Sequence, residues 1–217
     1  GSHCYICFYL RVAVFVRNKK GRLAMVLLIR RDYVVYRLQP SGIGEPAPPD
    51  IAAQCLELDS KEETARLFKN DKVLQSRFYN FCNKGFYGIV WHNENNWLSY
   101  AFFSLPETNG PPHLPRSLRR LPVYWIFYCR TKEEYQGKGL FKASLRLLAS
   151  WARERDPNAE VYIDTEPTNV PSRRAIEAVG FASAGIITTW TLTIPKIGSL
   201  VIYGCWDKKA RHPEVRV

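Results

Sequence analysis

The residues with the clearest chemical potential in this sequence form a glycine-rich turn, Gln136-Gly137-Lys138-Gly139. The turn follows the apolar run 123–129, which has the composition of a buried strand, and precedes a helical pattern over 140–155. Glycines allow another molecule to approach the backbone closely, and the first N–H groups of a helix lack partners within the helix. The helix end also carries about half a positive charge. The turn therefore predicts a site for a phosphate group.

Two common phosphate motifs do not fit this turn. A Walker loop requires Ser or Thr after its Gly-Lys pair, whereas Gly139 follows Lys138 here. A dinucleotide-binding GxGxxG loop requires a glycine at position 142, which is occupied by Lys142. A different kind of phosphate loop is therefore expected.

Two segments together resemble the Gcn5-related N-acetyltransferase (GNAT) superfamily. Gln136 and Gly139 match the first and fourth positions of its pyrophosphate loop, Arg/Gln-x-x-Gly-x-Gly/Ala. The segment "NVPSRRAIEAVGF", residues 169–181, is similar to the family's second motif, an asparagine followed by a short helix that ends in Gly-Phe. The order of the intervening elements also agrees. The resemblance extends over about 86–205 and is thin before position 86.

The resemblance implies a mixed-sheet α/β fold of the GNAT type, here with additional N-terminal strands, and acetyl-CoA as co-substrate. It further implies direct acyl transfer to an amine acceptor in a ternary complex, without a covalent enzyme intermediate. Cys129 is therefore interpreted as a core thiol and not as a nucleophile. The residues expected to contact the donor are Cys129, Arg130, Thr131, Gln136, Gly137, Lys138, Gly139, Leu140, Phe141, Asn169 and Ser172.

Three features depart from the family pattern. Phe141 stands where the signature has Gly or Ala, and Ile176 stands where members often have a tyrosine that protonates the departing thiolate. The run 123–129 lacks the glutamate that serves many members as general base. Acyl transfer still requires an unprotonated amine and a hydrogen-bond donor for the developing oxyanion. Backbone amides around 129–131 could supply that donor.

The candidates for the acid–base role are Tyr124, Tyr128, His92 and Glu94. The tyrosines are four positions apart in a predicted strand and are expected to share one face. His92 and Glu94 lie in or beside a predicted hairpin turn. Each of the four could instead be an ordinary core or turn residue. His113 lies in a proline-rich loop and is expected to be exposed to solvent.

The charge balance favours anionic partners. The chain has 31 Lys and Arg against 20 Asp and Glu, a net charge of +11. Arg116, Arg119 and Arg120 form a local cluster that could close over an anionic substrate. Two alternatives remain open: a CoA-binding regulatory module that has lost catalysis, and an RNA-directed acyltransferase or RNA-binding protein. Nucleic acid is the less favoured partner, because most of the cations are spread along the chain.

The cysteines bear on metal binding and compartment. Cys4 and Cys7 have the spacing of half a zinc site, but no second pair completes it, so no metal is predicted. The six scattered thiols indicate a reducing compartment, and a cytoplasmic location is expected. The apolar run 4–16 is interrupted by Arg11 and is shorter than the ~20 residues of a membrane helix. We expect no membrane attachment, and a monomer or homodimer.

The elements around the turn are predicted from periodicity and turn residues. Strands are expected over 5–17, 22–30, 33–39, 123–129, 161–165, 184–193 and 199–205, with a hairpin over 85–105. Helices are expected over 140–155 and 171–179, and two more before Gly85, the first capped by Asp59 or Ser60. Residues 40–50 and 104–122 are expected to be loops. These elements predict N-terminal strands and helices over 4–85 packed on a core of 86–205, with a basic tail over 206–217.

Overall fold

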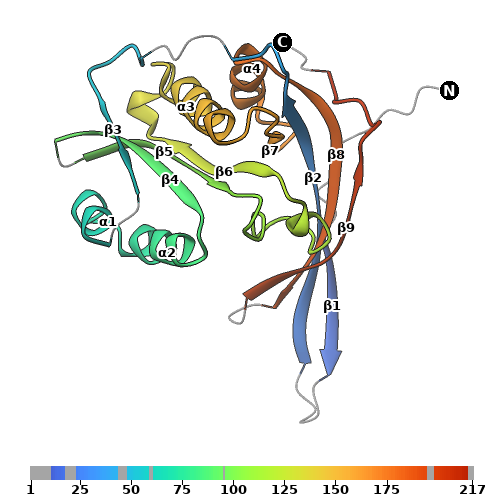
Figure 1. Ribbon diagram of the computed structural model, residues 1–217. Coiled ribbons are helices and arrows are strands. Elements are labelled where there is room, and N and C mark those ends of the chain that lie inside the picture. Colours follow the sequence, from blue (N-terminus) through green and yellow to red (C-terminus); the bar gives the residue numbers. More distant parts are fainter. Residues whose placement is uncertain are drawn as a thin grey trace.

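The computed structural model describes residues 11–17, 23–43, 48–58, 61–94, 96–194 and 198–214. In these residues the chain forms one nine-stranded mixed sheet and four α-helices (Figure 1). The strands are β1 Arg11–Arg17, β2 Leu23–Leu38, β3 Gln54–Glu57, β4 Tyr87–Asn93, β5 Asn96–Ser104, β6 Tyr124–Thr131, β7 Val161–Thr165, β8 Phe181–Ile194 and β9 Gly198–Asp207. The helices are α1 Lys61–Leu67, α2 Lys72–Asn83, α3 Leu140–Arg155 and α4 Val170–Ala178, with short 3-10 turns at Leu118–Arg120 and Glu133–Tyr135.

The strand order is β3-β4-β5-β6-β7-β2-β8-β9, and β1 pairs with β2 outside this path. Only β6 and β7 run parallel among the described strand pairs. Their pairing ends at Ile126 and Ile163. Beyond that point β6 continues along β5 as far as Thr131, and β7 continues along β2 as far as Thr165. The two strands therefore separate in the middle of the sheet.

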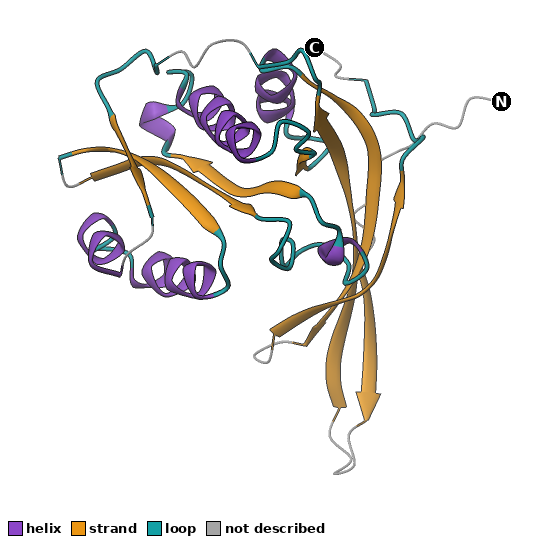
Figure 2. Cartoon of the chain, viewed as in Figure 1, coloured by secondary structure: helices purple, strands orange, loops and turns teal. Residues whose placement is uncertain are grey.

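Helices cover the two faces of the sheet separately (Figure 2). α1 and α2 lie on one face, where Phe78, Phe81, Tyr100 and Phe102 belong to a first hydrophobic cluster. α3 and α4 lie on the other face over a second cluster, which includes Leu145, Leu148 and Ile176. Aromatic rings dominate the first cluster, and the Phe78 ring lies 4.7–5.0 Å from those of Phe68, Tyr100 and Phe102. Such edge-to-face and tilted contacts add to the stabilisation from burial.

The mixed-sheet α/β fold class is confirmed, and the helix Leu140–Arg155 and the strand Val161–Thr165 have the predicted bounds. The hairpin and the C-terminal strand pair also form as predicted, with ends shifted by a few residues. The predicted N-cap at 59–60 and the beginning of the first predicted strand, 5–10, lie outside the described residues. The short edge strand β3 was not predicted.

β2 is one long strand that runs through both segments expected to be β, 22–30 and 33–39, because its central charges find partners. Arg30 pairs with Asp32 at 3.2 Å, and the Asp32 carboxylate accepts a hydrogen bond from Thr188 Oγ1 on β8 (2.6 Å). These contacts satisfy the polar side chains at the centre of the strand. β2 consequently lies between β7 and β8, inside the sheet.

A bulge in β6 changes the direction in which Tyr128 faces. Tyr128 has a φ of +51°, and the register with β5 shifts between Tyr100 and Phe102. The prediction that Tyr124 and Tyr128 share a strand face is therefore wrong. Tyr124 packs in the second cluster against Trp151, whereas Tyr128 packs against the first cluster, stacked on Tyr100. One extra residue on a strand reverses the facing of the residues after it.

Candidate active site

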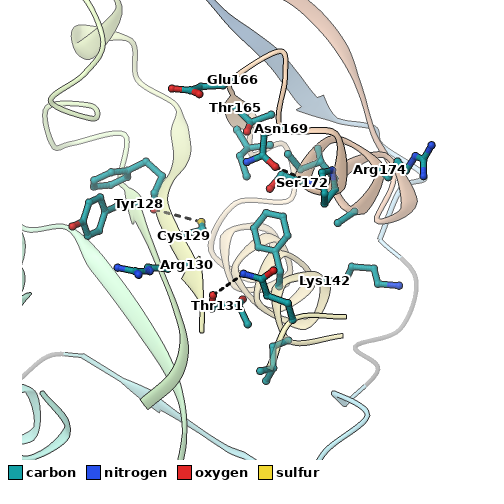
Figure 3. A pocket seen from close by; sticks show the side chains of 18 of the residues that line it. Tyr128, Cys129, Arg130, Thr131, Lys142, Thr165, Glu166, Asn169, Ser172 and Arg174 are labelled. Carbon is teal, nitrogen blue, oxygen red and sulfur yellow. Dashed lines mark hydrogen bonds between the residues drawn. The ribbon is translucent and has the colours of Figure 1, made fainter. Parts of the chain in front are cut away.

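A cavity of about 1050 Å³ lies where β6 and β7 separate. Its walls come from both strands, from the glycine turn before α3, from α4 and from the loop that follows β5. Figure 3 shows the side chains that β6, β7 and α4 contribute. Phe141 and Ile176 line it from the second hydrophobic cluster, and Tyr33 and Phe127 line it from the first. The cavity therefore reaches both faces of the sheet.

The glycine turn at one side of the cavity is shaped for an anion. Gly137 and Gly139 have φ values of +75° and +76°, a conformation that favours glycine. Ala143 N–H donates to Gly139 O (2.9 Å), so the amides of the first three helical residues precede the hydrogen-bonded part of α3. A Cβ built on Gly137 would meet nothing within 4 Å. The open backbone and the free amides fit a phosphate group.

The turn is tied to the separated end of β6. Gln136 Nε2 donates to Thr131 O (3.3 Å), and Thr131 Oγ1 is 2.9 Å from Ser99 Oγ on β5. On its other side the turn contacts Asp50, whose N–H donates to Lys138 O (3.2 Å). The Asp50 carboxylate lies 3.3 Å from the position of a Cβ on Gly139. An acidic side chain thus lies directly beside the predicted phosphate site.

α4 provides the wall opposite the turn. Asn169 caps this helix, with its Oδ1 accepting from Ser172 N–H (3.3 Å), as drawn in Figure 3. The helix is fixed by Arg173, a residue that is 4% exposed and whose guanidinium donates to Tyr36 Oη (3.1 Å) and to Pro213 O (2.7 Å). The amide nitrogen of Asn169 is not used by the cap and remains available as a donor at the cavity wall.

The substituted family positions form an apolar wall. Ile176 is fully buried in the second cluster and also borders the cavity. Phe141 is half-buried, packs against the same cluster and borders the cavity as well. Neither side chain can donate a proton. Phe141 and Ile176 therefore contribute apolar surface to the cavity wall and no acid–base group.

The Cys129 thiol is a poor nucleophile, because it is held in its protonated form. Burial, with a smaller contribution from the Asp164 carboxylate, raises the pKa of this thiol to about 12. Its Sγ–H points to Phe127 O at 3.6 Å. The thiol is therefore protonated at neutral pH, as expected for a core residue.

An acid–base pair lies on the face of the first cluster. His113 Nε2 is 3.0 Å and 3.1 Å from the two carboxylate oxygens of Asp164. Asp164 is 5% exposed at its side chain and also accepts a hydrogen bond from Trp125 Nε1 (2.6 Å). Because the carboxylate can only accept from Nε2–H, Nδ1 carries the free electron pair when His113 is neutral. His113 and Asp164 both border the cavity.

His113 is therefore not the solvent-exposed loop residue expected from the sequence. Its side chain is 31% exposed, and its ring centroid lies 5.3 Å from that of Tyr33. Burial raises the pKa of Tyr33, so that phenol is protonated at neutral pH. The sequence did hold one signal for this pair, since Asp164 is an acidic residue near the end of an otherwise apolar buried strand, "VYIDT".

The predicted donor-contacting residues gather around the cavity, with one exception. Those that border it are Cys129, Arg130, Thr131, Gln136, Gly137, Gly139, Leu140, Phe141, Asn169 and Ser172. Lys138 is not among the lining residues, and its Nζ lies 5.4 Å from the centroid of the Tyr135 ring.

Of the four acid–base candidates, only Tyr128 borders the cavity. Its hydroxyl accepts a hydrogen bond from Arg77 on α2. Tyr124 is buried among the rings of Phe103 and Trp151. His92 is 6% exposed on β4, and Glu94 lies in the hairpin turn, where its carbonyl accepts from Arg66 (3.4 Å). These three lie outside the cavity.

Neither a metal site nor a membrane-spanning helix is found among the described residues. Within the described residues, no group of three or more His, Cys, Asp or Glu side chains could hold a metal ion. Cys4 and Cys7 lie outside the described residues. Among the described helices, none has the length and apolar character needed to cross a membrane.

The parallel strands β6 and β7 separate beside a glycine turn that leads into α3. This arrangement is that of an acyl-CoA N-acyltransferase type of fold. The sequence model of the Acetyltransferase (GNAT) family matches residues 53–181, more than half of the chain. The chain belongs to this family. A comparison with curated proteins returned no match.

Solved structures give the same fold. A GNAT-family acetyltransferase from Colwellia psychrerythraea is 14% identical, with a TM-score of 0.51 over 75% of this chain and 55% of that one. A conserved protein of unknown function from Staphylococcus epidermidis is 9% identical, with a TM-score of 0.53 over 77% of this chain and 63% of that one. A tandem GNAT protein from the clavulanic acid biosynthesis pathway is 13% identical, with a TM-score of 0.50 and coverages of 76% and 53%. The match therefore spans only about half to three fifths of each relative's length.

Proposed function

We propose that this chain is an acyl-CoA-dependent N-acyltransferase that uses acetyl-CoA and an amine acceptor. The observation that carries the proposal is the cavity between β6 and β7. It combines free helix amides on one side with the His113–Asp164 pair on the other. A donor and an acceptor could thus enter from opposite faces of the sheet and meet between the strands.

On the donor side, the pyrophosphate would accept hydrogen bonds from the amides of Leu140, Phe141 and Lys142 at the start of α3. The pantetheine arm would lie in the space between the strands, where the Asn169 amide nitrogen is available to it. The apolar wall of Phe141 and Ile176 suits the aliphatic parts of that arm. In this arrangement the thioester would lie near Cys129 on β6.

On the acceptor side, His113 would serve as general base. In the transfer step the amine nitrogen attacks the thioester carbonyl carbon, a C–N bond forms and the C–S bond breaks. The proton of the attacking amine passes to Nδ1 of His113, while Asp164 holds Nε2–H and stabilises the imidazolium. Backbone amides around 129–131 would donate to the developing oxyanion.

The departing group would not need a protein acid in this mechanism. A thiol has a pKa of about 8.5 in water, so its thiolate is a tolerable leaving group near neutral pH. It can take a proton from solvent after the C–S bond breaks. The aliphatic Ile176 is compatible with that route, although it removes the proton donor that family members often have at this position.

A binding module without catalysis is the second candidate. Ile176 and Phe141 favour it, because both replace small or reactive residues of the family pattern. The two functions differ in a direct way: the module binds acetyl-CoA but transfers no acetyl group to any amine.

The test is calorimetric titration with acetyl-CoA of the parent, Gly137→Asn and Gly137→Asp. Asn and Asp have the same size and tolerate a positive φ comparably, so the pair differs essentially in charge. We expect the Asp variant to bind acetyl-CoA about tenfold more weakly than the Asn variant, because a carboxylate opposes the pyrophosphate. Equal affinities of the two variants, or no binding by the parent, would contradict the proposed donor site.

A further inference from the structure

A second cavity, of about 590 Å³, lies between the end of α2 and the loop that follows β5. Among the described residues, it shares no lining residue with the cavity between β6 and β7. Four cationic side chains line it: Lys84, Arg116, Arg119 and Arg120. The other lining residues are Phe86, Asn109, Gly110 and Pro112, so this cavity has no carboxylate among its described walls.

The loop that supplies the three arginines is fixed in place. Leu114 is fully buried, and Leu118 and Leu121 pack against the first hydrophobic cluster. Gly110 N–H donates to Arg119 O (2.7 Å), which closes the loop on the 3-10 turn. The cations therefore converge because buried leucines between them anchor the backbone.

These four side chains have no acidic partner in the part of the chain that the structure describes. The ion pairs of the described residues are Arg30–Asp32, Arg37–Glu160 and His113–Asp164. Arg119 Nε is buried and lacks a hydrogen-bond partner among the described residues. Like charges held together without a counter-charge repel one another. An anion in the cavity would remove that repulsion.

We propose that this second cavity binds a small phosphate-bearing molecule. Guanidinium groups match the geometry of phosphate oxygens and can bind them in pairs. The volume lies within the ~300–1,000 Å³ usual for small-molecule sites. A compact cluster of four cations around a hollow of this size favours a small ligand over a nucleic acid strand, which would be expected to follow a longer basic surface.

The position of the site suggests an effect on the first cavity. Pro112 lines the second cavity, and the next residue, His113, lines the first. A ligand bound by the arginines would therefore hold the segment that carries the His113 ring.

The test is calorimetric titration with inorganic triphosphate in the Gly137→Asp background, which weakens anion binding at the glycine turn. We expect saturable binding of one triphosphate per chain. The double variant Arg116→Gln/Arg120→Gln, in the same background, should reduce the affinity at least tenfold. Both side chains are exposed and removing their charge relieves repulsion, so we expect the melting temperature not to fall. Lys209→Gln/Arg211→Gln is the matched control, because it removes the same charge from exposed positions elsewhere and should change the affinity less than twofold.

Three results would overturn the proposal: no saturable binding, equal losses in the two double variants, or binding of only a single-stranded RNA through the same arginines. The last result would indicate a nucleic acid surface, with affinity falling steeply as salt rises. Acetyl-CoA titration of Arg116→Gln/Arg120→Gln in the otherwise unchanged chain should match the parent. The failure of this site and the failure of the acyltransferase proposal are therefore separately observable.

Discussion

The two sides of the cavity between β6 and β7 are built from the chain in different ways. The donor side comes mainly from one continuous stretch, in which the turn 136–139 leads directly into α3. The acceptor side brings together Tyr33 from β2, His113 from a loop, and Asp164 from β7, with Trp125 of β6 behind them. A site made by one turn depends on local backbone geometry, whereas a site made by four segments depends on the packing of the whole sheet.

The comparison predicts that acid–base chemistry and donor binding can be lost separately. His113→Gln keeps a side-chain donor for Asp164 but cannot accept a proton at neutral pH. We expect kcat for acetyl transfer to a verified amine to fall about 10²–10⁴-fold. The Kd for acetyl-CoA should stay within about twofold in calorimetry, because the donor side does not include this residue.

A loss of donor affinity equal to the loss of kcat would show that the two sides are not independent. An unchanged kcat would remove His113 from the mechanism. The melting temperature of the variant serves as the control for folding.

Asp164→Asn tests the orientation of the imidazole. An amide can present its NH₂ group to Nε2, which would place the imidazole proton on Nδ1 and remove the proposed base. We expect kcat to fall about 10–10³-fold, with little change in acetyl-CoA binding. Steady-state kinetics of Asp164→Asn, His113→Gln and the double variant should show non-additive losses, since the residues act as a unit. Additive losses would mean that Asp164 supports only the structure.

Asp50→Asn sharpens the donor side of the comparison. The Asp50 carboxylate lies beside the glycine turn, and its backbone hydrogen bond to Lys138 O does not involve the side chain. Removing its charge should tighten acetyl-CoA binding about two- to tenfold, because a negative charge near the pyrophosphate is lost. The gain should diminish at high salt, since the side chain is exposed. Calorimetry at two salt concentrations measures both effects, and unchanged binding at low salt would place the pyrophosphate away from Asp50.

Cys129→Ala gives the smallest expected effect. Burial raises the pKa of this thiol to about 12, so it is protonated at pH 7. We expect kcat to change less than about threefold in the variant, and iodoacetamide to modify this residue slowly in the parent. A hundredfold loss of kcat together with a trapped acetyl-thioester would instead indicate a covalent intermediate.

The sequence allowed the donor side to be predicted further than the acceptor side. The glycines of the turn and the periodicity of α3 are local signals, and both correspond to elements of the structure. The position of Tyr128 depends on a bulge that no spacing revealed. The His113–Asp164 contact joins a loop to a strand 51 residues later, and only tertiary packing creates it. The four-residue strand β3 was missed because its side chains are mostly exposed and show no alternation.

The place of β2 in the sheet has a consequence for how the chain folds. Val34 pairs with Thr165 and Leu38 pairs with Phe181, so a strand made early must wait for partners made much later. Contacts so distant in sequence slow folding, because a long loop must close before they form. During synthesis the backbone hydrogen-bonding groups of β2 around Val34–Leu38 would remain without their strand partners until β7 and β8 emerge. We therefore expect refolding of the chain to be slow, and to be sensitive to aggregation at high protein concentration.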